Sequence, residues 1–377
     1  MLVDAKKSFQ RVRENIDQVD SDLVNLIAKR LELTGEVGRL KAELDLPLYV
    51  PSRESELIKQ KRQLAGEKGI SPDLVEDVIR RIMRESYVNQ SYTRSEVAET
   101  KAQKIVIVGG EGQLGRLFVN LFIQSGYSVT VVEKNNWIEC EQALKNASLV
   151  MVAVPIRVTE QVIDKLSNLS EECILADITS IKDLPIKTML KVHKGPVIGL
   201  HPMFGPGVEH LAKQTIVVCK GRGENKAKWL IEQMEQWGAN LSFIDSNEHD
   251  HLMSIVQVLR HFSTIAYGYH LMEENIDLDK VLELSSPIYR LELIMVGRLF
   301  AQNSELYSDI IFSDTKNIPM VKRFIQRLLD LFETLENQDK ETFAILFDNV
   351  SNWFGDNANK FLQESNHLLA KASDIKK

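Results

Sequence analysis

The sequence predicts an all-α N-terminal domain, a central α/β domain with a largely parallel sheet, and an all-α C-terminal domain. Apolar residues recur at three- and four-residue spacing before residue 90, β-branched runs alternate with amphipathic stretches from residue 104, and strand signals stop after Ile244. We therefore expect domains at residues 1–92, 104–246 and 247–377, with a polar linker at 93–103.

Composition narrows the class of protein. The chain has 377 residues, 44% hydrophobic and 26% charged, which suits two or three folded domains. Its net charge of -7 disfavours broad binding to nucleic acid or anionic membranes, although a local basic pocket can still hold a small anion. No apolar run approaches the roughly 20 residues that cross a bilayer, and the N-terminus lacks a signal peptide's apolar stretch. We expect a cytoplasmic protein.

The cysteines indicate no metal site and no disulfide. Cys140, Cys173 and Cys219 form no C-x-x-C pattern, and two of them lie inside apolar runs. We expect reduced thiols that pack as small hydrophobic side chains.

The first segment predicts one long helix. Its apolar positions are Val12, Ile16, Val19, Leu23, Leu26, Ile27, Leu31 and Leu33. About 37 residues at roughly 1.5 Å each would extend some 55 Å, too far to be covered by the two short helices that follow. A partner chain is the natural source of the missing surface, so we expect a homodimer.

Two shorter helices follow in the sequence. Pro51 fits the first turn of the second helix, which glycines at 66 and 69 interrupt. Ser71, Pro72 and Asp73 supply a cap, a proline at the first helical position and an acidic first turn for the third helix, through about residue 90.

Seven strands are expected in the central domain, at residues 104–108, 127–132, 148–154, 173–177, 196–200, 215–219 and 239–244. Amphipathic stretches between several of them indicate βαβ crossovers and hence parallel pairing. Beyond residue 247 the chain is predicted to be helical, with breaks near Asp277, Pro287 and Pro319.

A glycine-rich loop follows the first strand and predicts a Rossmann domain that binds a dinucleotide. Gly110, Gly112 and Gly115 form G-x-G-x-x-G at the start of an amphipathic helix, with Gln113 and Leu114 in the same turn. Gly110 would permit the tight turn, Gly112 the approach of backbone to pyrophosphate, and Gly115 close packing of helix on strand. The alternative is a glycine-rich turn without a ligand.

Glu133 ends the second strand, 23 residues after Gly110. A carboxylate there accepts hydrogen bonds from the adenosine ribose and repels a 2'-phosphate, so we expect NAD rather than NADP.

His201, in GLHPMFGP, is the best-placed base for an oxidised hydroxyl, because it follows a buried strand and precedes a Pro- and Gly-rich loop. A structural loop histidine is the alternative. Ser180 follows another strand end and could hydrogen-bond the base or the cofactor. His261 lies eleven residues after Asp250, on nearly the same face of an α-helix.

Arg290 and Arg298 lie eight residues apart in an apolar segment, within roughly 80° on a helix. Buried arginines need partners, so these two could bind a carboxylate. Internal ion pairs with Glu283 or Glu292 are an equal alternative.

These residues resemble known families. Residues 104–377, with IVGGEGQLGRLF, VPI, LHPMFGP, EHD, LRHF and SSPIYRLELIMVGR, resemble prephenate dehydrogenase, and residues 1–90 resemble the all-helical chorismate mutase domain. The whole chain resembles the bifunctional chorismate mutase/prephenate dehydrogenases of bacterial tyrosine biosynthesis. The resemblance implies an intertwined mutase dimer and a C-terminal dimerisation domain.

For the mutase, the resemblance assigns seven positions: Arg13, Arg30, Lys41, Arg53, Glu54, Ser86 and Gln90. The rearrangement of chorismate needs no cofactor, so a dianion must be held in a chair-like pose while charge on the breaking ether is stabilised. Arginines suit the two carboxylates, and the resemblance implies that Lys41 and Gln90 reach the ether oxygen.

Helical spacing is compatible with this assignment. Arg30 and Lys41 point the same way on the long helix, as do Ser86 and Gln90 on the third, whereas Arg13 falls about 100° away from Arg30. Arg13 could serve the partner's site in the family's intertwined dimer. The alternative is a solvated charged helix face. Val50 stands where mutase relatives can carry Asp.

For the dehydrogenase, the resemblance assigns His201 as base for the ring hydroxyl and Arg298 to a prephenate carboxylate. Ser180 and His261 would support the site, and Asp250 would join its polar network. The expected function converts chorismate to prephenate and then to 4-hydroxyphenylpyruvate, with NAD as cofactor and tyrosine as feedback inhibitor. The alternatives are an arogenate dehydrogenase with a non-catalytic helical dimerisation domain, and a non-enzymatic NAD sensor on a helical scaffold.

Overall fold

The computed structural model describes residues 2–96 and 100–374. It forms two compact units, Met1–His249 and Asp250–Lys377, so that the N-terminal helices and the sheet belong to the same unit. No helix in the described ranges is long and apolar enough to span a membrane.

Three helices build the N-terminal part: α1 (Leu2–Glu43), α2 (Pro51–Glu67) and α3 (Pro72–Glu96). The predicted long helix and both proline starts are confirmed. The predicted end of the third helix, near residue 90, was wrong: α3 continues to Glu96, so residues 93–96, expected in the linker, are helical. Thr93 hydrogen-bonds the Asn89 carbonyl at 3.1 Å, and its side chain packs where Gly35 and Gly38 bring α1 close. Packing against α1 explains why this polar stretch stays helical.

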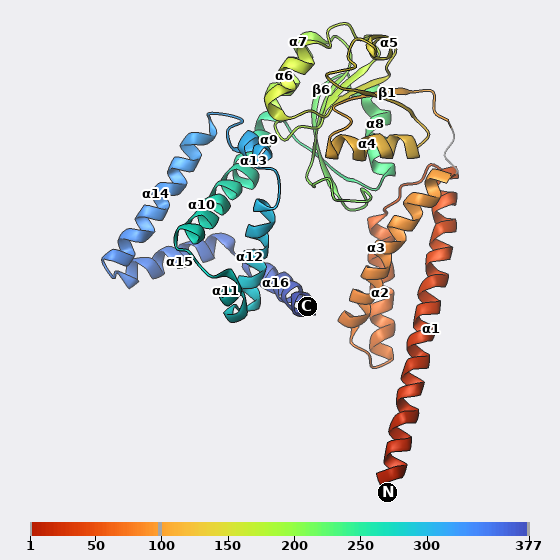
Figure 1. The fold of residues 1–377 in the computed structure, drawn as a ribbon, viewed down its shortest axis with the longest axis vertical. Coiled ribbons are helices and arrows are strands. Elements are labelled where there is room, and N and C mark those ends of the chain that lie inside the picture. Colours follow the sequence, from red (N-terminus) through yellow and green to blue (C-terminus); the bar gives the residue numbers. More distant parts are fainter. Residues whose placement is uncertain (1, 97–99, 375–377) are drawn as a thin grey trace. The chain divides into compact units, whose positions relative to one another are not determined.

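The apolar stripe of α1 is exposed in the single chain. Val12, Ile16, Val19, Leu23 and Leu26 are 48–65% exposed, and α1 extends well past α2 and α3 (Figure 1). At roughly 1.5 Å per residue its 42 residues span about 63 Å. The two companion helices are too short to cover it, as the sequence predicted.

The sheet has seven strands in the order β2-β1-β3-β4-β5-β6-β7. They are β1 (Lys104–Val108), β2 (Ser128–Val132), β3 (Leu149–Val152), β4 (Ile174–Asp177), β5 (Val197–Pro202), β6 (Thr215–Arg222) and β7 (Asn240–Phe243). All neighbours are parallel except β5 and β6, which no helix separates in sequence. The predicted largely parallel sheet is confirmed.

Helices cover both faces of this sheet (Figure 1). Ile105 and Ile107 point into one core with α4 (Gln113–Gln124) and α8 (Glu224–Gln236). Val106 and Val108 point into the other with α5 (Glu141–Lys145), α6 (Ile156–Asp164) and α7 (Asp183–Val192). Because side chains alternate along a strand, continuous apolar strands are what a sheet buried on both faces requires.

Two of the three cysteines are buried as expected, and Cys140 is only half-buried. Cys173 and Cys219 are fully buried in the second core, and burial raises the pKa of the Cys173 thiol to about 12. Such a thiol is inert rather than reactive.

The second unit is helical throughout its described length. The helix α9 (Ser246–Met253) begins in the first unit and is followed by a π-helix, η1 (Ser254–Leu259). The remaining helices are α10 (Arg260–Glu273), α11 (Leu278–Leu284), α12 (Pro287–Phe300), α13 (Ser304–Ile311), α14 (Asn317–Glu336), α15 (Lys340–Phe354) and α16 (Asp356–Asp374). Asp277 and Ser286 cap α11 and α12 with their side chains, which accounts for two of the predicted breaks.

Candidate active sites

Arg30, Ser86 and Gln90 lie where α1 packs on α3. Arg30 Nη1 donates to Ser86 Oγ at 2.6 Å, and both Ser86 and Gln90 are buried. Burial lowers the pKa of Arg30, yet a guanidinium stays charged in any protein at neutral pH. The Gln90 amide oxygen is buried with no hydrogen-bond partner among the described residues. A half-buried cation and an unsatisfied amide suit a polar, anionic ligand.

Two glycines bring these helices together. A Cβ at Gly38 would lie 2.8 Å from the Gln90 carbonyl oxygen and 2.9 Å from its Cα, and a Cβ at Gly35 would lie 3.2 Å from the Asn89 amide. Asn89 in turn donates to the Leu31 carbonyl at 2.6 Å. The absence of a side chain at Gly35 and at Gly38 therefore lets α3 approach α1 closely at Gln90.

Three other predicted mutase residues are described by their own contacts and exposure. Lys41 is half-buried, and its Nζ donates to the Leu48 carbonyl at 2.7 Å. Arg53 is exposed at the start of α2. Arg13 is exposed on α1 and lies over the Phe9 ring, 4.4 Å from its centroid. An exposed Arg13 is compatible with service to a partner's site.

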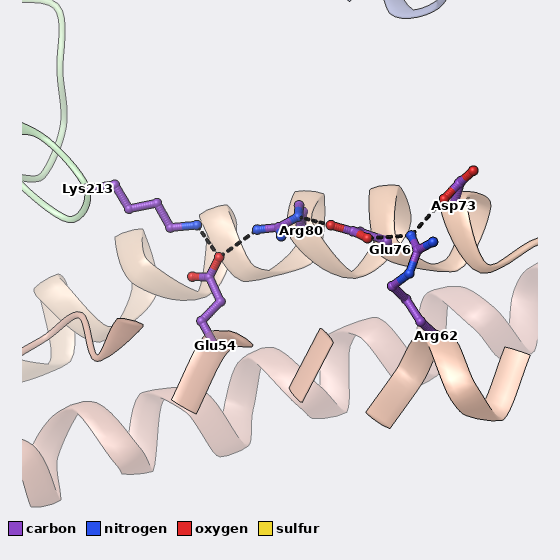
Figure 2. A network of polar contacts seen from close by, with 6 residues as sticks. All are labelled: Glu54, Arg62, Asp73, Glu76, Arg80 and Lys213. Carbon is purple, nitrogen blue, oxygen red and sulfur yellow. Dashed lines mark hydrogen bonds and ion pairs between the residues drawn. The ribbon is translucent and has the colours of Figure 1, made fainter. Parts of the chain in front are cut away.

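Glu54 belongs to a chain of ionic contacts. Figure 2 shows Lys213, Glu54, Arg80, Glu76, Arg62 and Asp73 alternating in charge. Glu54 is only 6% exposed; its Oε1 accepts from Arg80 at 2.9 Å and from Lys213 Nζ, while its Oε2 accepts from the Tyr87 hydroxyl at 2.8 Å. The sequence predicted Glu54 but gave no sign of Lys213.

The glycine loop joins β1 to the N-terminus of α4. Gly109, which the sequence analysis did not name, has φ +84° and makes the tight turn that was assigned to Gly110. A Cβ at Gly110 would instead lie 2.9 Å from Val131, and one at Gly115 would lie 3.0 Å from the Gly110 Cα. The predicted close packing at Gly115 is thus confirmed, whereas the turn assignment was wrong because the left-handed residue precedes Gly110.

The same loop offers a place for an anion. Gly112 is the N-cap of α4, and no side chain in the described structure caps it. Gln113 and Leu114 form the first turn, so their amides point toward the loop. Glu133 follows β2, and its Oε1 accepts the Glu111 N–H at 2.8 Å. A carboxylate therefore lies beside the glycine loop, as a ribose-binding residue should.

His201 ends β5 and is 2% exposed, next to His249, which is 1% exposed. The His201 Nδ1 and His249 Nε2 atoms lie 2.8 Å apart. Burial, followed by the nearby His249 and Lys182, lowers the pKa of His201 well below its usual value. His201 is therefore neutral at pH 7 and carries one nitrogen lone pair.

A buried ion pair lies beside His201 that the sequence analysis missed. Lys182 and Asp177 are both 0% exposed and hydrogen-bonded to each other, and Lys182 Nζ also donates to the Leu200 carbonyl at 2.7 Å. Ser180 is half-buried on the same loop, and Thr179 bonds to Asp177. The signal in the sequence is the segment DITSIK, which begins at the last residue of the buried strand β4, but its pattern indicates Ser180 rather than Lys182.

The EHD segment places His249 against His201, a contact that the sequence did not indicate. A π-helix lies between Asp250 and His261 and has a wider turn than an α-helix, so the α-helical spacing used to predict their shared face does not apply. His261 is 8% exposed and packs edge-on against Tyr307 with centroids 4.8 Å apart. Burial lowers the pKa of His261 to about 4.

Arg290 and Arg298 both lie on α12, half-buried and exposed respectively. Neither forms an ion pair with Glu283 or Glu292 in the described part of the chain. The internal pairing considered from the sequence is therefore not seen, and Arg298 presents its guanidinium to solvent within its own unit.

Comparison with known proteins identifies the family of each part of the chain. Family models match three consecutive segments: chorismate mutase type II at residues 12–91, the prephenate dehydrogenase nucleotide-binding domain at 125–240, and the prephenate dehydrogenase dimerization domain at 245–349. A protein of Enterobacter agglomerans named T-protein is 49% identical over 96% of this chain and 97% of its own length. The chain belongs to the bifunctional chorismate mutase/prephenate dehydrogenase family.

Other relatives agree with this bifunctional family. The T-protein of Haemophilus influenzae is 45% identical over 98% of each chain. A crystal structure of prephenate dehydrogenase from A. aeolicus, in complex with hydroxyphenyl propionate and NAD+, matches with a TM-score of 0.53. The match covers 67% of this chain and 96% of that one at 18% identity, so it supports the fold of the dehydrogenase part alone.

Proposed function

We propose that this chain converts chorismate to prephenate in its mutase domain and then oxidises prephenate to 4-hydroxyphenylpyruvate with NAD, as part of tyrosine biosynthesis. The observation that carries the proposal is the family's full-length match together with two separate polar sites in one chain. We assign residues 1–92 to the mutase, 104–246 to nucleotide binding and 247–377 to prephenate binding and dimerisation.

In the mutase site, the proposed task is to hold a dianion in a reactive conformation. Arg30, fixed by Ser86, and Arg53 would bind carboxylates, with Arg13 contributed by the partner subunit of a homodimer. The exposed apolar stripe on α1 supports that homodimer. Lys41 and Gln90 would stabilise negative charge on the ether oxygen, and the unsatisfied Gln90 amide supports this role.

In the dehydrogenase site, His201 is the proposed base. When Nδ1 donates to His249, the lone pair of His201 resides on Nε2, and this nitrogen accepts the proton of the substrate's ring hydroxyl. Loss of the ring carboxylate as carbon dioxide then makes the ring aromatic, so the step is effectively irreversible. Ser180, His261 and Asp250 would support the site, while Arg298, with Arg290 nearby on the same helix, would bind a prephenate carboxylate.

The glycine loop and Glu133 fit NAD as cofactor. The uncapped N-terminus of α4 would receive the pyrophosphate, and the Glu133 carboxylate would accept from the ribose hydroxyls. Bound there, NAD supplies the hydride acceptor. The residues Gly110, Gly112, Gln113, Leu114 and Gly115 form the proposed cradle.

Two further assignments belong to the proposal. Tyrosine would act as feedback inhibitor through a site in the dehydrogenase half, with the prephenate pocket as one candidate location. The buried thiols suit a reducing compartment, which supports the cytosol as the place of action.

One assay separates this function from its alternatives. The purified chain receives NAD with chorismate, with prephenate or with arogenate, and the formation of NADH is followed by its absorbance. NADH from both substrates supports the proposal. NADH from prephenate alone would leave only the dehydrogenase, NADH from arogenate in preference to prephenate would change the substrate, and NADH from none would refute the enzyme.

A further inference from the structure

The connector between β5 and β6 reaches from one candidate site to the other. It comprises residues 203–214, from just after His201 and Pro202 in β5 to the start of β6 at Thr215. Ala212, near its end, is 3% exposed and belongs to a core cluster with Leu48 and Tyr87 of the mutase domain. The nucleotide-binding domain thus completes part of the mutase domain's apolar core.

Backbone contacts make this junction close-packed. The Leu48 N–H donates to the Gln236 carbonyl at 2.9 Å, and the Lys213 N–H donates to the Gly238 carbonyl at 3.0 Å. Gly238 has φ +87°, and a Cβ there would lie 3.0 Å from the Ala212 Cα and 3.1 Å from the Tyr49 Cβ. A side chain at this position would separate the two domains, so their contact is specific.

Lys213 is held tightly at this junction. Its backbone has φ +68°, a conformation that a residue with a side chain rarely adopts without support from its surroundings. Its Nζ bonds Glu54 and lies 5.5 Å from the Tyr49 ring centroid and 5.9 Å from that of Tyr87. One ammonium group from the nucleotide-binding domain is therefore directed at one carboxylate of the mutase domain.

Charge explains what Lys213 contributes. The six groups of Figure 2 alternate in sign and sum to zero with Lys213 present. Arg80 is the other cation on Glu54, but it also pairs with Glu76 at 2.7 Å. Without Lys213 the network would carry one net negative charge, close to a site that must accept a dianion.

We propose that Lys213 is a positioning residue for the mutase reaction, supplied by the nucleotide-binding domain, which neutralises and orients Glu54 for chorismate. This inference rests on the proposed mutase function and on the assignment of Glu54 to the mutase site by the family resemblance. It assigns to the dehydrogenase half a direct part in the first reaction, beyond the second reaction that it performs itself.

The test compares Lys213→Met with Lys213→Arg and with a matched control, Lys226→Met, all in the full-length chain. Lys226 forms an exposed ion pair with Glu172 at 2.7 Å, so its loss removes a comparable charge from the same domain. We expect Lys213→Met to raise the KM for chorismate by about tenfold and to change kcat less than about threefold, because an unbalanced charge weakens binding of the dianion. Lys213→Arg should restore most of the affinity.

A double-mutant cycle isolates the contact. In a Glu54→Gln background the carboxylate charge is gone, so Lys213→Met should raise KM by less than about twofold further. Dehydrogenase activity on prephenate and the Tm serve as measures of intact folding. An unchanged KM in Lys213→Met would overturn the proposal, and so would an equal loss of both activities, since that would make Lys213 a packing residue only. A wild-type chain that does not rearrange chorismate would instead refute the mutase function itself.

Discussion

Replacement of His201 by asparagine gives the sharpest test of the dehydrogenase site. The Asn amide N–H can donate to His249 Nε2 much as the His201 Nδ1–H does across 2.8 Å, so the buried contact is kept. What is lost is the second ring nitrogen, which is the proposed proton acceptor. General-base catalysis contributes about 10²–10⁴-fold, which corresponds to about 2.7–5.5 kcal/mol of transition-state stabilisation.

We therefore expect His201→Asn to lower kcat for prephenate oxidation by about 10²–10⁴-fold, with KM changed less than about threefold. NADH formation from prephenate measures the loss, and chorismate consumption by the same sample reports on the fold. His193→Asn is the matched control, because His193 is also buried, at 3% exposure, and its Nε2 lies 2.8 Å from the Cys173 carbonyl, away from His201. It should reduce Tm and leave kcat near that of the wild type.

Two results would refute the reasoning. A loss of kcat smaller than tenfold in His201→Asn would mean that another group accepts the proton. A parallel loss of mutase activity would mean that the substitution disturbs the whole unit rather than the chemistry.

Three further substitutions test the remaining sites. Arg30→Ala should reduce mutase kcat/KM by at least about 10³-fold while prephenate oxidation stays within about twofold, because a half-buried arginine proposed to bind a carboxylate is lost from one site only. Equal losses in the two assays would contradict separate sites. Gly38→Ala should lower Tm and reduce mutase activity by about tenfold, because the new Cβ meets the Gln90 backbone and overpacking costs about 1–3 kcal/mol of stability. An unchanged Tm would show that α1 and α3 can move apart without cost. Glu133→Ser should raise the KM for NAD, because the carboxylate that accepts from the ribose is lost, and lower the KM for NADP, because the repulsion of the 2'-phosphate is removed. Parallel assays of NADH and NADPH formation measure both values. Equal affinities of the wild type for NAD and NADP would exclude this role for Glu133.

Local features of the sequence predicted most of the fold. The three- and four-residue period of α1, the prolines that open α2 and α3, and the apolar strands depend on residues close together in the chain. The glycine loop was predictable for the same reason, because the G-x-G-x-x-G pattern lies within the six consecutive residues 110–115. Two wrong predictions depend on neighbours that are distant in the sequence. The tight turn was assigned to Gly110, but the Ala153 carbonyl leaves no room for a side chain at Gly109, and α3 was ended too early because Thr93 packs on α1.

The tertiary structure alone decided which polar groups meet. The sequence indicated Ser180, Asp250 and Glu54 as members of sites, but it could not show that Lys182 pairs with Asp177. Nor could it show that Lys213 reaches Glu54 across 159 positions. Ion pairs and buried hydrogen bonds have no periodicity in the sequence, because their partners are brought together only when distant elements pack. The sequence by itself thus determined the family, the three structural parts and most candidate residues, whereas packing determined which side chains orient His201 and which charge balances Glu54.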